Sequence, residues 1–283
     1  MIRQSASMAA KLRKLMRRSC VAMPGAFNAA TARLIERAGF DAVYVSGAGL
    51  SNAAAGVPDI GLLSRRQVAE LAGFIAAAVK VPVIVDADTG FGGPRDAAAT
   101  VEQFARAGIA GMHMEDQVSA KRCGHLGGKM LITPVAMSAK IRAAVASRKR
   151  HDFLVIARTD ARSVEGFGAA ARRARMYLDA GADAIFPEAL ESEDEFAEFA
   201  RLVRAPLMAN MTEFGKSPLL GLGKLAQLGY RLVIFPQTAF RVAMKAEEKL
   251  LRDLRRLGTQ RQWLGKMQTR RELYDLLDYK PGA

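Results

Sequence analysis

The sequence is poor in the features that mark secreted and membrane proteins. It has only two cysteines, Cys20 and Cys123, which is too few for a disulfide framework. No apolar run approaches the ~20 residues that cross a bilayer, and no secretory apolar segment opens the chain. Cys20 lies in an apolar run and is expected to be a small buried hydrophobic residue. These absences predict a protein of the reducing cytoplasm with no membrane partner.

Acidic residues are scarce relative to basic ones, and the formal net charge is +14. Such a charge is one signature of nucleic-acid binding. The basic residues are spread along helical segments, however, without an aromatic-interleaved basic patch or a recognisable DNA or RNA module. An anionic small-molecule substrate explains the charge at least as well, so no nucleic-acid partner is expected.

The first acidic residue is Glu36, so the stretch 1–18 is rich in Arg, Lys and Ser and has no acid. This composition is similar to that of a mitochondrial presequence. The spacing of Leu12, Leu15 and Met16 favours the alternative, an amphipathic N-terminal helix that packs on the domain.

From residue 21 onward the chain repeats an apolar run, a polar or glycine-rich turn and an amphipathic segment. The apolar runs expected to be strands are 21–24, 42–46, 83–88, 111–115, 153–159, 184–188, 207–212 and 232–236. The segments expected to be helices are 28–38, 64–79, 94–107, 134–148, 166–180, 193–203, 219–228 and 239–257. Eight βα units in succession predict a closed (β/α)8 TIM barrel, an α/β fold in which 1–283 forms a single domain.

An open, doubly wound sheet is the alternative to the barrel. Such a sheet usually has fewer strands and a phosphate-binding glycine turn after the first of them. Here the segment from Pro24 to Asn28 follows the first strand, and no GxGxxG motif occurs. The tail 259–279 is left over once eight units are assigned. It is expected to be a further helix that packs on a neighbouring subunit or caps the barrel.

Polar residues gather where the apolar runs end, which in a barrel is the rim that carries the active site. Asp86 and Asp88 are two apart on a strand, so their carboxylates share a side and repel unless a cation or proton intervenes. With Glu115 on the next strand, the set is oxygen-only and suits Mg²⁺, or Mn²⁺, completed by water and substrate oxygens. The alternative is that these carboxylates pair with Arg or Lys. Zinc is disfavoured because no His or Cys lies at ligand spacing.

Other strand ends offer groups that bind carboxylates. The small-residue turn 46–49 presents backbone N–H groups that can cradle a carboxylate, and the alternative is a tight turn without a ligand. Arg158 and Arg241 can each clamp a carboxylate with two hydrogen bonds. A structural Arg–Glu pair, for example with Glu188, is the alternative for either.

A basic segment, 121–125, carries the second cysteine. Lys121, Arg122 and His125 flank Cys123, and such a positive field favours the thiolate. The glycines at 124, 127 and 128 allow the segment to move as a closing loop. The alternative is a basic surface loop whose cysteine has no role. His125 is a candidate for orienting the loop or tuning Cys123, whereas His113 is expected to be a satisfied interior histidine.

Together these motifs resemble the isocitrate lyase/phosphoenolpyruvate mutase superfamily. The resemblance covers nearly the whole chain through 85–92, 115–117, 121–125, 157–161, 186–189, 210–215 and 267–274. The Cys123 loop makes the chain most similar to the short bacterial 2-methylisocitrate lyase branch, since the mutases and oxaloacetate decarboxylases generally lack that cysteine. Phe186 also fits this branch. Two places depart from the family pattern: Ala48 stands where Gly is usual, and 126–129 is rich in glycine. These departures leave the identity of the substrate open.

The resemblance implies a Mg²⁺-dependent lyase that cleaves 2-methylisocitrate to pyruvate and succinate by retro-Claisen chemistry, in the methylcitrate cycle of propionate metabolism. It implies a homotetramer that exchanges its C-terminal helix at 259–279. The alternatives within the family are a lyase for a related 2-hydroxy acid such as 2,3-dimethylmalate, a phosphonate mutase or hydrolase, and an oxaloacetate decarboxylase.

The resemblance also implies roles for individual residues. Cys123 is expected to be the general acid, and Arg158 to screen the developing charge; Tyr44 is one hypothesis for the base, and a metal-activated or water-relayed route is another. Asp86, Asp88 and Glu115 match metal-ligand positions. The positions that match substrate contacts are Ser46, Gly47, Ala48, Cys123, Gly124, Arg158, Glu188, Asn210, Thr212, Arg241 and Arg270.

Overall fold

The computed structural model describes residues 7–119, 121–122, 124–148 and 152–280. Its strands are β1 (Val21–Pro24), β2 (Val43–Val45), β3 (Val83–Asp86), β4 (Gly111–Glu115), β5 (Leu154–Thr159), β6 (Ala184–Pro187), β7 (Met208–Asn210) and β8 (Leu232–Phe235). Its longer helices are α1 (Met8–Arg18), α2 (Ala29–Arg37), α4 (Arg65–Ala77), α5 (Pro94–Arg106), α6 (Pro134–Ser147), α7 (Phe167–Asp179), α8 (Glu193–Leu202) and α10 (Thr238–Leu257). Shorter helical segments are α3 (Gly47–Leu50), η1 (Ser51–Ala55), η3 (Ala161–Ser163), α9 (Leu222–Gln227), η4 (Arg261–Lys266) and α11 (Arg270–Leu276). Within these ranges, no helix is long and apolar enough to cross a bilayer.

Two isolated bridges join the strands into a ring. Parallel ladders give the orders β2-β3-β4-β5-β6 and β1-β8-β7. Gly25 then pairs with Tyr44, and Ile185 with Leu207, so that β1 joins β2 and β6 joins β7. Glycine is needed at the first seam, because a Cβ on Gly25 would lie 2.0 Å from the Pro236 carbonyl oxygen. The (β/α)8 barrel predicted from the sequence is confirmed, and each strand lies within one of the eight predicted apolar runs.

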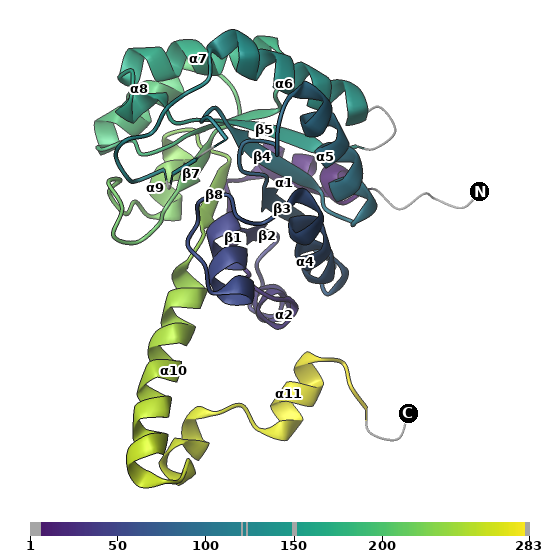
Figure 1. Cartoon of the computed structure of the whole chain (residues 1–283), viewed down its shortest axis with the longest axis vertical. Coiled ribbons are helices and arrows are strands. Elements are labelled where there is room, and N and C mark those ends of the chain that lie inside the picture. Colours follow the sequence, from purple (N-terminus) through teal and green to yellow (C-terminus); the bar gives the residue numbers. More distant parts are fainter. Residues whose placement is uncertain (1–6, 120, 123, 149–151, 281–283) are drawn as a thin grey trace, which may run out of the picture.

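Alternate residues of each strand face two separate cores. On β5, Leu154 and Ile156 belong to a cluster inside the barrel, whereas Val155 and Ala157 pack in an outer cluster with the surrounding helices. This follows from the two-residue period of side chains along a strand. Burial on both faces explains why the strands read as continuous apolar runs rather than as alternating ones. Figure 1 shows the helices wrapped around the outside of the strands.

The N-terminal helix α1 closes the amino end of the barrel. It begins at Ser7, whose Oγ accepts the Ala10 N–H at 3.0 Å as an N-cap. Leu12 and Met16 are buried and belong to the cluster inside the barrel. Burying one such side chain stabilises the fold by about 1.5–3 kcal/mol. Arg13 Nη1 also donates to an Asp183 oxygen just before β6, at 2.7 Å.

The C-terminal part leaves the barrel. Helix α10 has no buried residue and extends away from the body of the molecule (Figure 1). The tail expected to be one helix over 259–279 is instead two helical segments, η4 and α11. The break arises because Thr269 starts a new helix: its Oγ1 accepts the Glu272 N–H at 3.2 Å, and the Glu272 carboxylate accepts the Thr269 N–H at 2.6 Å. Helix α11 then returns to α2, where Arg33 donates to the Leu276 carbonyl at 3.1 Å.

Candidate active site

A cavity of about 430 Å³ opens at the carboxyl ends of the strands. It brings together most residues that the sequence predicted for the site: Tyr44, Ser46, Ala48, Asp86, Gly124, His125, Arg158, Phe186, Glu188, Asn210, Thr212 and Arg241. Asn52, Asp59 and Gln237 also line it, and sequence reasoning did not single them out. The sequence could have indicated these three because each is a polar residue in the loop after β2 or β8.

The paired carboxylates of β3 meet a lysine from the loop after β4. Asp86 Oδ1 accepts the Asp88 N–H at 2.9 Å, and Asp88 has a positive φ of 46°. Lys121 Nζ lies 2.6 Å from an Asp88 oxygen and 2.5 Å from an Asp59 oxygen. The alternative of a carboxylate–lysine pair is therefore observed at Asp88. Even so, burial and the nearby charge of Asp86 raise the pKa of Asp88 to about 6, against the opposing effect of Lys121.

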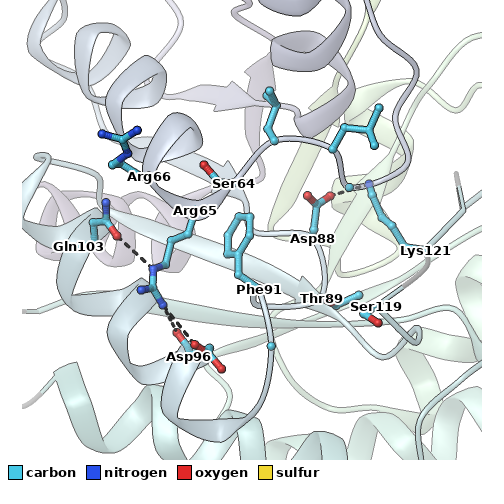
Figure 2. Close-up of a pocket in the computed structure, with 14 residues that line it drawn as sticks. Ser64, Arg65, Arg66, Asp88, Thr89, Phe91, Asp96, Gln103, Ser119 and Lys121 are labelled. Carbon is cyan, nitrogen blue, oxygen red and sulfur yellow. Dashed lines mark hydrogen bonds and ion pairs between the residues drawn. The ribbon is translucent and has the colours of Figure 1, made fainter.

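A second cavity, of about 700 Å³, is lined by this lysine and Asp88. Figure 2 shows Asp88 and Lys121 facing each other on its wall, with Phe91 and Arg65 nearby. The Arg65 guanidinium is turned away from them, toward Asp96 at 3.7 Å. The ion pair of Lys121 with Asp88 therefore forms part of the wall of this second cavity.

Glu115 ends β4 and has an ion-pair partner but, within the described ranges, no side-chain hydrogen bond. It is 1% exposed, and neither carboxylate oxygen has a hydrogen-bond partner among the described residues. Its nearest cation in an ion pair is Arg158, whose Nε lies 3.3 Å away. Burial raises the pKa of Glu115 well above its usual value, although Arg158 and Lys121 act in the opposite direction. A cation in this region would relieve both the bare oxygens and the raised pKa.

The donor set fits a divalent cation that is only partly held by protein. Within the described ranges, no three carboxylate, imidazole or thiol groups converge closely enough to form an ion site by themselves. Mg²⁺ commonly uses one or two carboxylates and takes water and substrate oxygens for the rest of its octahedron. Asp86 and Asp88, with Glu115 behind them, supply such a set, and the site is consistent with a divalent metal.

Arg158 ends β5 and lies among three carboxylates. Its Nε is 2.9 Å from Asp160 and 3.3 Å from Glu115, and its Nη1 is 3.0 Å from Glu188. Burial lowers the pKa of Arg158, but these carboxylates outweigh burial and raise it well above its usual value. Lys129 Nζ supports Asp160 from the other side at 2.8 Å. The Arg–Glu pair considered from the sequence is thus present, and the same guanidinium lines the cavity.

Asp116 braces this network from behind. Its carboxylate accepts the Thr159 hydroxyl at 2.8 Å, the Asp160 N–H at 2.9 Å and the Tyr177 hydroxyl at 2.7 Å. Arg173 adds a contact at 3.3 Å. Because all these groups are buried, the bonds fix the ends of β4 and β5 relative to each other.

Tyr44, which lines the cavity, forms a buried pair with His113. The Tyr44 hydroxyl lies 2.7 Å from His113 Nε2, while His113 Nδ1 has no hydrogen-bond partner among the described residues and lies 3.8 Å from Asp86. His113 is therefore only half satisfied, contrary to the sequence-based expectation. Burial raises the pKa of Tyr44 well above its usual value, which disfavours the phenolate that a base would need. Tyr44 as the base stays a prediction.

The loop that bears the second cysteine is held over the cavity by a histidine. Cys123 itself lies outside the described residues. His125 Nδ1 accepts the Lys216 backbone N–H at 3.0 Å, and its Nε2 lies 3.0 Å from a Glu188 oxygen. Because the backbone N–H of Lys216 can only donate, the Nδ1 atom that accepts it carries no proton. The imidazole proton is therefore on Nε2 and faces the Glu188 carboxylate. His125 therefore fastens the loop to the ends of β6 and β7.

Two small residues are fitted to their neighbours. A Cβ on Gly124 would lie 2.2 Å from Arg158 Nη2, so only glycine allows this approach. The stretch 46–48 leads into the short helix α3 instead of forming a simple turn. The Gly47 N–H donates to an Asp86 oxygen at 3.3 Å, so this amide is already engaged by a predicted metal ligand.

The remaining predicted contacts differ in position. Asn210 Nδ2 donates to both Glu188 oxygens at 3.3 and 3.4 Å, and its Oδ1 has no partner in the described ranges. Arg241 lines the cavity with its Nε 3.7 Å from Glu213. Arg270 begins α11 and is not among the residues that line the cavity of its own chain. Its role as a substrate contact stays a prediction.

Comparison with known proteins gives matches along almost the whole chain. The family model described as phosphoenolpyruvate phosphomutase matches residues 12–255. A 2-methylisocitrate lyase of Aeropyrum pernix is 52% identical over 269 residues, which are 95% of this chain and 86% of that protein.

Solved structures agree in fold. A 2,3-dimethylmalate lyase, described as a PEP mutase/isocitrate lyase superfamily member, has a TM-score of 0.92 at 36% identity and covers 97% of this chain and 92% of its own. A phosphonopyruvate hydrolase in complex with oxalate and Mg²⁺ has a TM-score of 0.87 at 32% identity and covers 96% of this chain and 95% of its own. The chain therefore belongs to the phosphoenolpyruvate mutase/isocitrate lyase superfamily and is an enzyme of its carbon–carbon lyase branch.

Proposed function

We propose that this enzyme is a Mg²⁺-dependent 2-methylisocitrate lyase that releases pyruvate and succinate. The observation that carries the proposal is the convergence in one cavity of the Asp86 carboxylate, the Arg158 guanidinium and the loop that bears Cys123. The 52% identity to a 2-methylisocitrate lyase over 95% of the chain supports the choice of substrate. The same resemblance supports a cytoplasmic place in the methylcitrate cycle.

In the proposed reaction the bond between C2 and C3 of the substrate breaks. A base takes the proton of the C2 hydroxyl, with Tyr44 or a water-relayed route as the candidates; the hydroxyl becomes the carbonyl of pyruvate, and the electron pair of the broken bond remains on C3. Arg158 stabilises the charge that spreads from C3 onto the neighbouring carboxylate. Cys123 then gives its proton to C3, which yields succinate. His125 holds the loop closed and keeps water away from the carbanion.

Asp86 and Asp88 would hold Mg²⁺, with Glu115 in an outer position, and Mn²⁺ is the alternative ion. The bound ion would supply positive charge to the hydroxyl and carboxylate oxygens of the substrate. Binding of Mn²⁺ to metal-stripped protein, followed by its paramagnetic resonance signal, tests the assignment without any turnover. Asp88→Asn should weaken this binding at least about tenfold, since one charged oxygen ligand is lost. Unchanged binding in that variant would remove Asp88 from the site.

The general-acid role of Cys123 gives the direct test of the reaction. We expect Cys123→Ser to lose cleavage by about 10²–10⁴-fold while it still binds substrate in calorimetry. Cys20→Ser is the matched control, since that thiol lies near the amino end of the barrel, away from the cavity. Near-normal turnover of Cys123→Ser would refute the proposed role.

A second candidate is a lyase for 2,3-dimethylmalate, favoured by the TM-score of 0.92 to an enzyme of that name. Pyruvate release from the two acids, measured side by side in the presence of Mg²⁺, separates the candidates. We expect the larger kcat/KM with 2-methylisocitrate. A phosphonate mutase or hydrolase and an oxaloacetate decarboxylase are disfavoured by Cys123, and the same assay series should detect no turnover of their substrates.

We also propose a homotetramer in which the α10–α11 arm packs on a neighbouring subunit. The arm exposes many apolar side chains, among them Val242, Leu251, Leu254, Leu264 and Leu273. Exposed apolar side chains gathered on one element mark a surface for protein–protein contact. Light scattering should show a smaller assembly for Leu251→Glu with Leu254→Glu. Lys249→Glu on the same helix is the control and should keep the tetramer.

A further inference from the structure

The amino ends of the strands carry a basic cavity that the proposed reaction does not use. The charged residues that line this amino-end cavity, of about 530 Å³, are Arg13, Arg17, Arg204, Arg231 and Asp183. The first two belong to α1, whereas Arg204 follows α8 and Arg231 directly precedes β8. The active-site cavity opens at the opposite ends of the strands and shares no lining residue with this one.

The one carboxylate of the lining is already compensated. Asp183 Oδ1 accepts a hydrogen bond from Arg13 Nη1 at 2.7 Å, and its Oδ2 accepts the Val155 N–H at 2.9 Å. Arg148, which does not line the cavity, donates to the same carboxylate. Asp183 thus has two guanidinium partners, so its charge does not neutralise the remaining arginines.

Those three arginines have no such partner. The ion pairs near the cavity join Asp183 to Arg13 and Arg148, and within the described ranges none involves Arg17, Arg204 or Arg231. A cleft lined by charges of one sign concentrates ions of the opposite sign. Arginine in particular binds phosphate and carboxylate groups through pairs of parallel hydrogen bonds.

Helix dipoles account for only part of this arrangement. A cation near the carboxyl end of a helix is stabilised by the helix dipole, which covers Arg17 in the last turn of α1 and Arg204 just after α8. Arg231 lies past the end of α9, at the start of a strand. Burial raises the pKa of Cys20, and the charge of Arg231 opposes this rise, so the Arg231 guanidinium lies near the junction of α1 and β1.

We propose that the amino-end cavity binds a compact polyanion, a small molecule that carries two or more phosphate or carboxylate groups. The volume lies within the range of about 300–1,000 Å³ that is usual for small-molecule sites. The ligand bridges Arg17 of α1 to Arg204 and Arg231 of the barrel, and so fastens the N-terminal helix to the base of the barrel. A nucleic acid needs a longer run of basic contacts along its backbone than the lining of one cavity provides.

Calorimetry of the metal-free full chain with pyrophosphate, propane-1,2,3-tricarboxylate and inorganic phosphate tests the site. We expect one of the two polyanions to bind once per chain and at least about tenfold more tightly than phosphate, because it engages several arginines at once. The tighter of the two shows whether phosphate or carboxylate groups are preferred. Affinities no higher than that of phosphate for both polyanions would overturn the proposal.

Two double variants separate the site from general attraction to a basic protein. Arg17→Gln with Arg231→Gln should weaken the tighter polyanion at least about tenfold, because two charged partners are lost. Arg95→Gln with Arg142→Gln removes the same charge at exposed positions outside the cavity and should keep Kd within about twofold. Equal weakening by both double variants would overturn the proposal. If the first is unstable by far-UV circular dichroism, Arg204→Gln, at an exposed position, replaces it with the same expectation.

Further measurements locate the anion and identify its class. Arg241→Gln alters the active-site cavity and should leave the affinity unchanged, whereas loss of binding in this variant alone would place the anion there and overturn the proposal. The bound polyanion, at about a hundred times its Kd, should raise Tm by about 4 °C in the wild type and not in Arg17→Gln with Arg231→Gln. A DNA duplex of about 12 base pairs that binds more tightly than either polyanion, and is lost in the same variant, would overturn the proposal in favour of a nucleic acid.

Discussion

Replacing Arg158 with methionine tests whether the buried ion network holds the strand ends together. Methionine keeps much of the volume but removes the guanidinium that contacts Glu115, Asp160 and Glu188. These three carboxylates are at most 1% exposed, so water cannot replace the lost partner. Removing one member of a buried ion pair costs about 3–5 kcal/mol. We expect a loss of that size in the free energy of unfolding, toward its lower end because Lys129 still pairs with Asp160.

The loss should depend on pH. In the wild-type chain burial raises the pKa of Glu188, but Arg158 outweighs it and brings the pKa below its usual value of 4.5. Ionised Glu188 therefore contributes stability above pH 4.5 that is lost as the pH falls through the lowered pKa. In Arg158→Met much of the effect that opposes burial is gone, so the pKa of Glu188 rises. The stability that depends on Glu188 is then lost as the pH rises through this raised pKa. The deficit of the variant should thus be larger near about pH 8 than near about pH 5.

Urea unfolding followed by far-UV circular dichroism measures both effects. Arg162→Met is the matched control, since Arg162 pairs with Glu191 and Glu195 at the surface. Its stability should change by less than about 1 kcal/mol, as is usual for exposed pairs. Arg158→Lys keeps the charge and should fall between the two. A loss below about 1 kcal/mol for Arg158→Met at both pH values would refute the reasoning.

Three further changes test other parts of the molecule. Gly124→Ala should lower kcat/KM by about 10²-fold, because the added Cβ meets the Arg158 guanidinium. Gly127→Ala is the control and should be neutral, because its Cβ meets nothing within 4 Å. Equal effects of the two changes would contradict the close fit at Gly124. Leu12→Ala should cost about 2–5 kcal/mol in urea unfolding, and a cost below about 1 kcal/mol would mean that α1 does not fill the barrel. Cys20 is half-buried rather than fully buried as expected, and burial raises its pKa to about 11. In Cys123→Ser, alkylation of Cys20 by iodoacetamide near about pH 8 should therefore be at least about tenfold slower than that of an unperturbed thiol, and an equal rate would contradict the burial effect.

The repeating part of the fold was predictable because its signals are local. Each strand is buried on both faces, so it reads as an apolar run, and the helices between them keep their own period. Gly39, Gly108 and Gly181 close helices with positive φ, as their Ala-Gly context predicts. The stretch after β2 was harder, because its glycines predict a turn while packing of Leu50, 1% exposed, stabilises the short helix α3.

The partners within the site were not predictable from one sequence. Strand ends place Asp86, Glu115 and Arg158 on one rim by topology alone. Which groups touch across that rim depends on loop paths. Lys121 reaches Asp59 across 62 positions of the chain, and no local pattern links the two. The four arginines of the amino-end cavity are likewise brought together only by the fold.

The helix that fills the base of the barrel has a consequence for the order of folding. Leu12 shares its cluster with Leu232 and Ile234 of the final strand, so its binding place does not exist until β8 has closed the ring. During synthesis the first helix therefore emerges long before it can dock. It must wait, with its apolar stripe and basic face in solvent, while the rest of the chain follows. Contacts this distant in sequence slow folding. The closing of the barrel and the docking of its first helix should form one late, cooperative step, so a chain shortened before β8 would keep its start unfolded as well as its end.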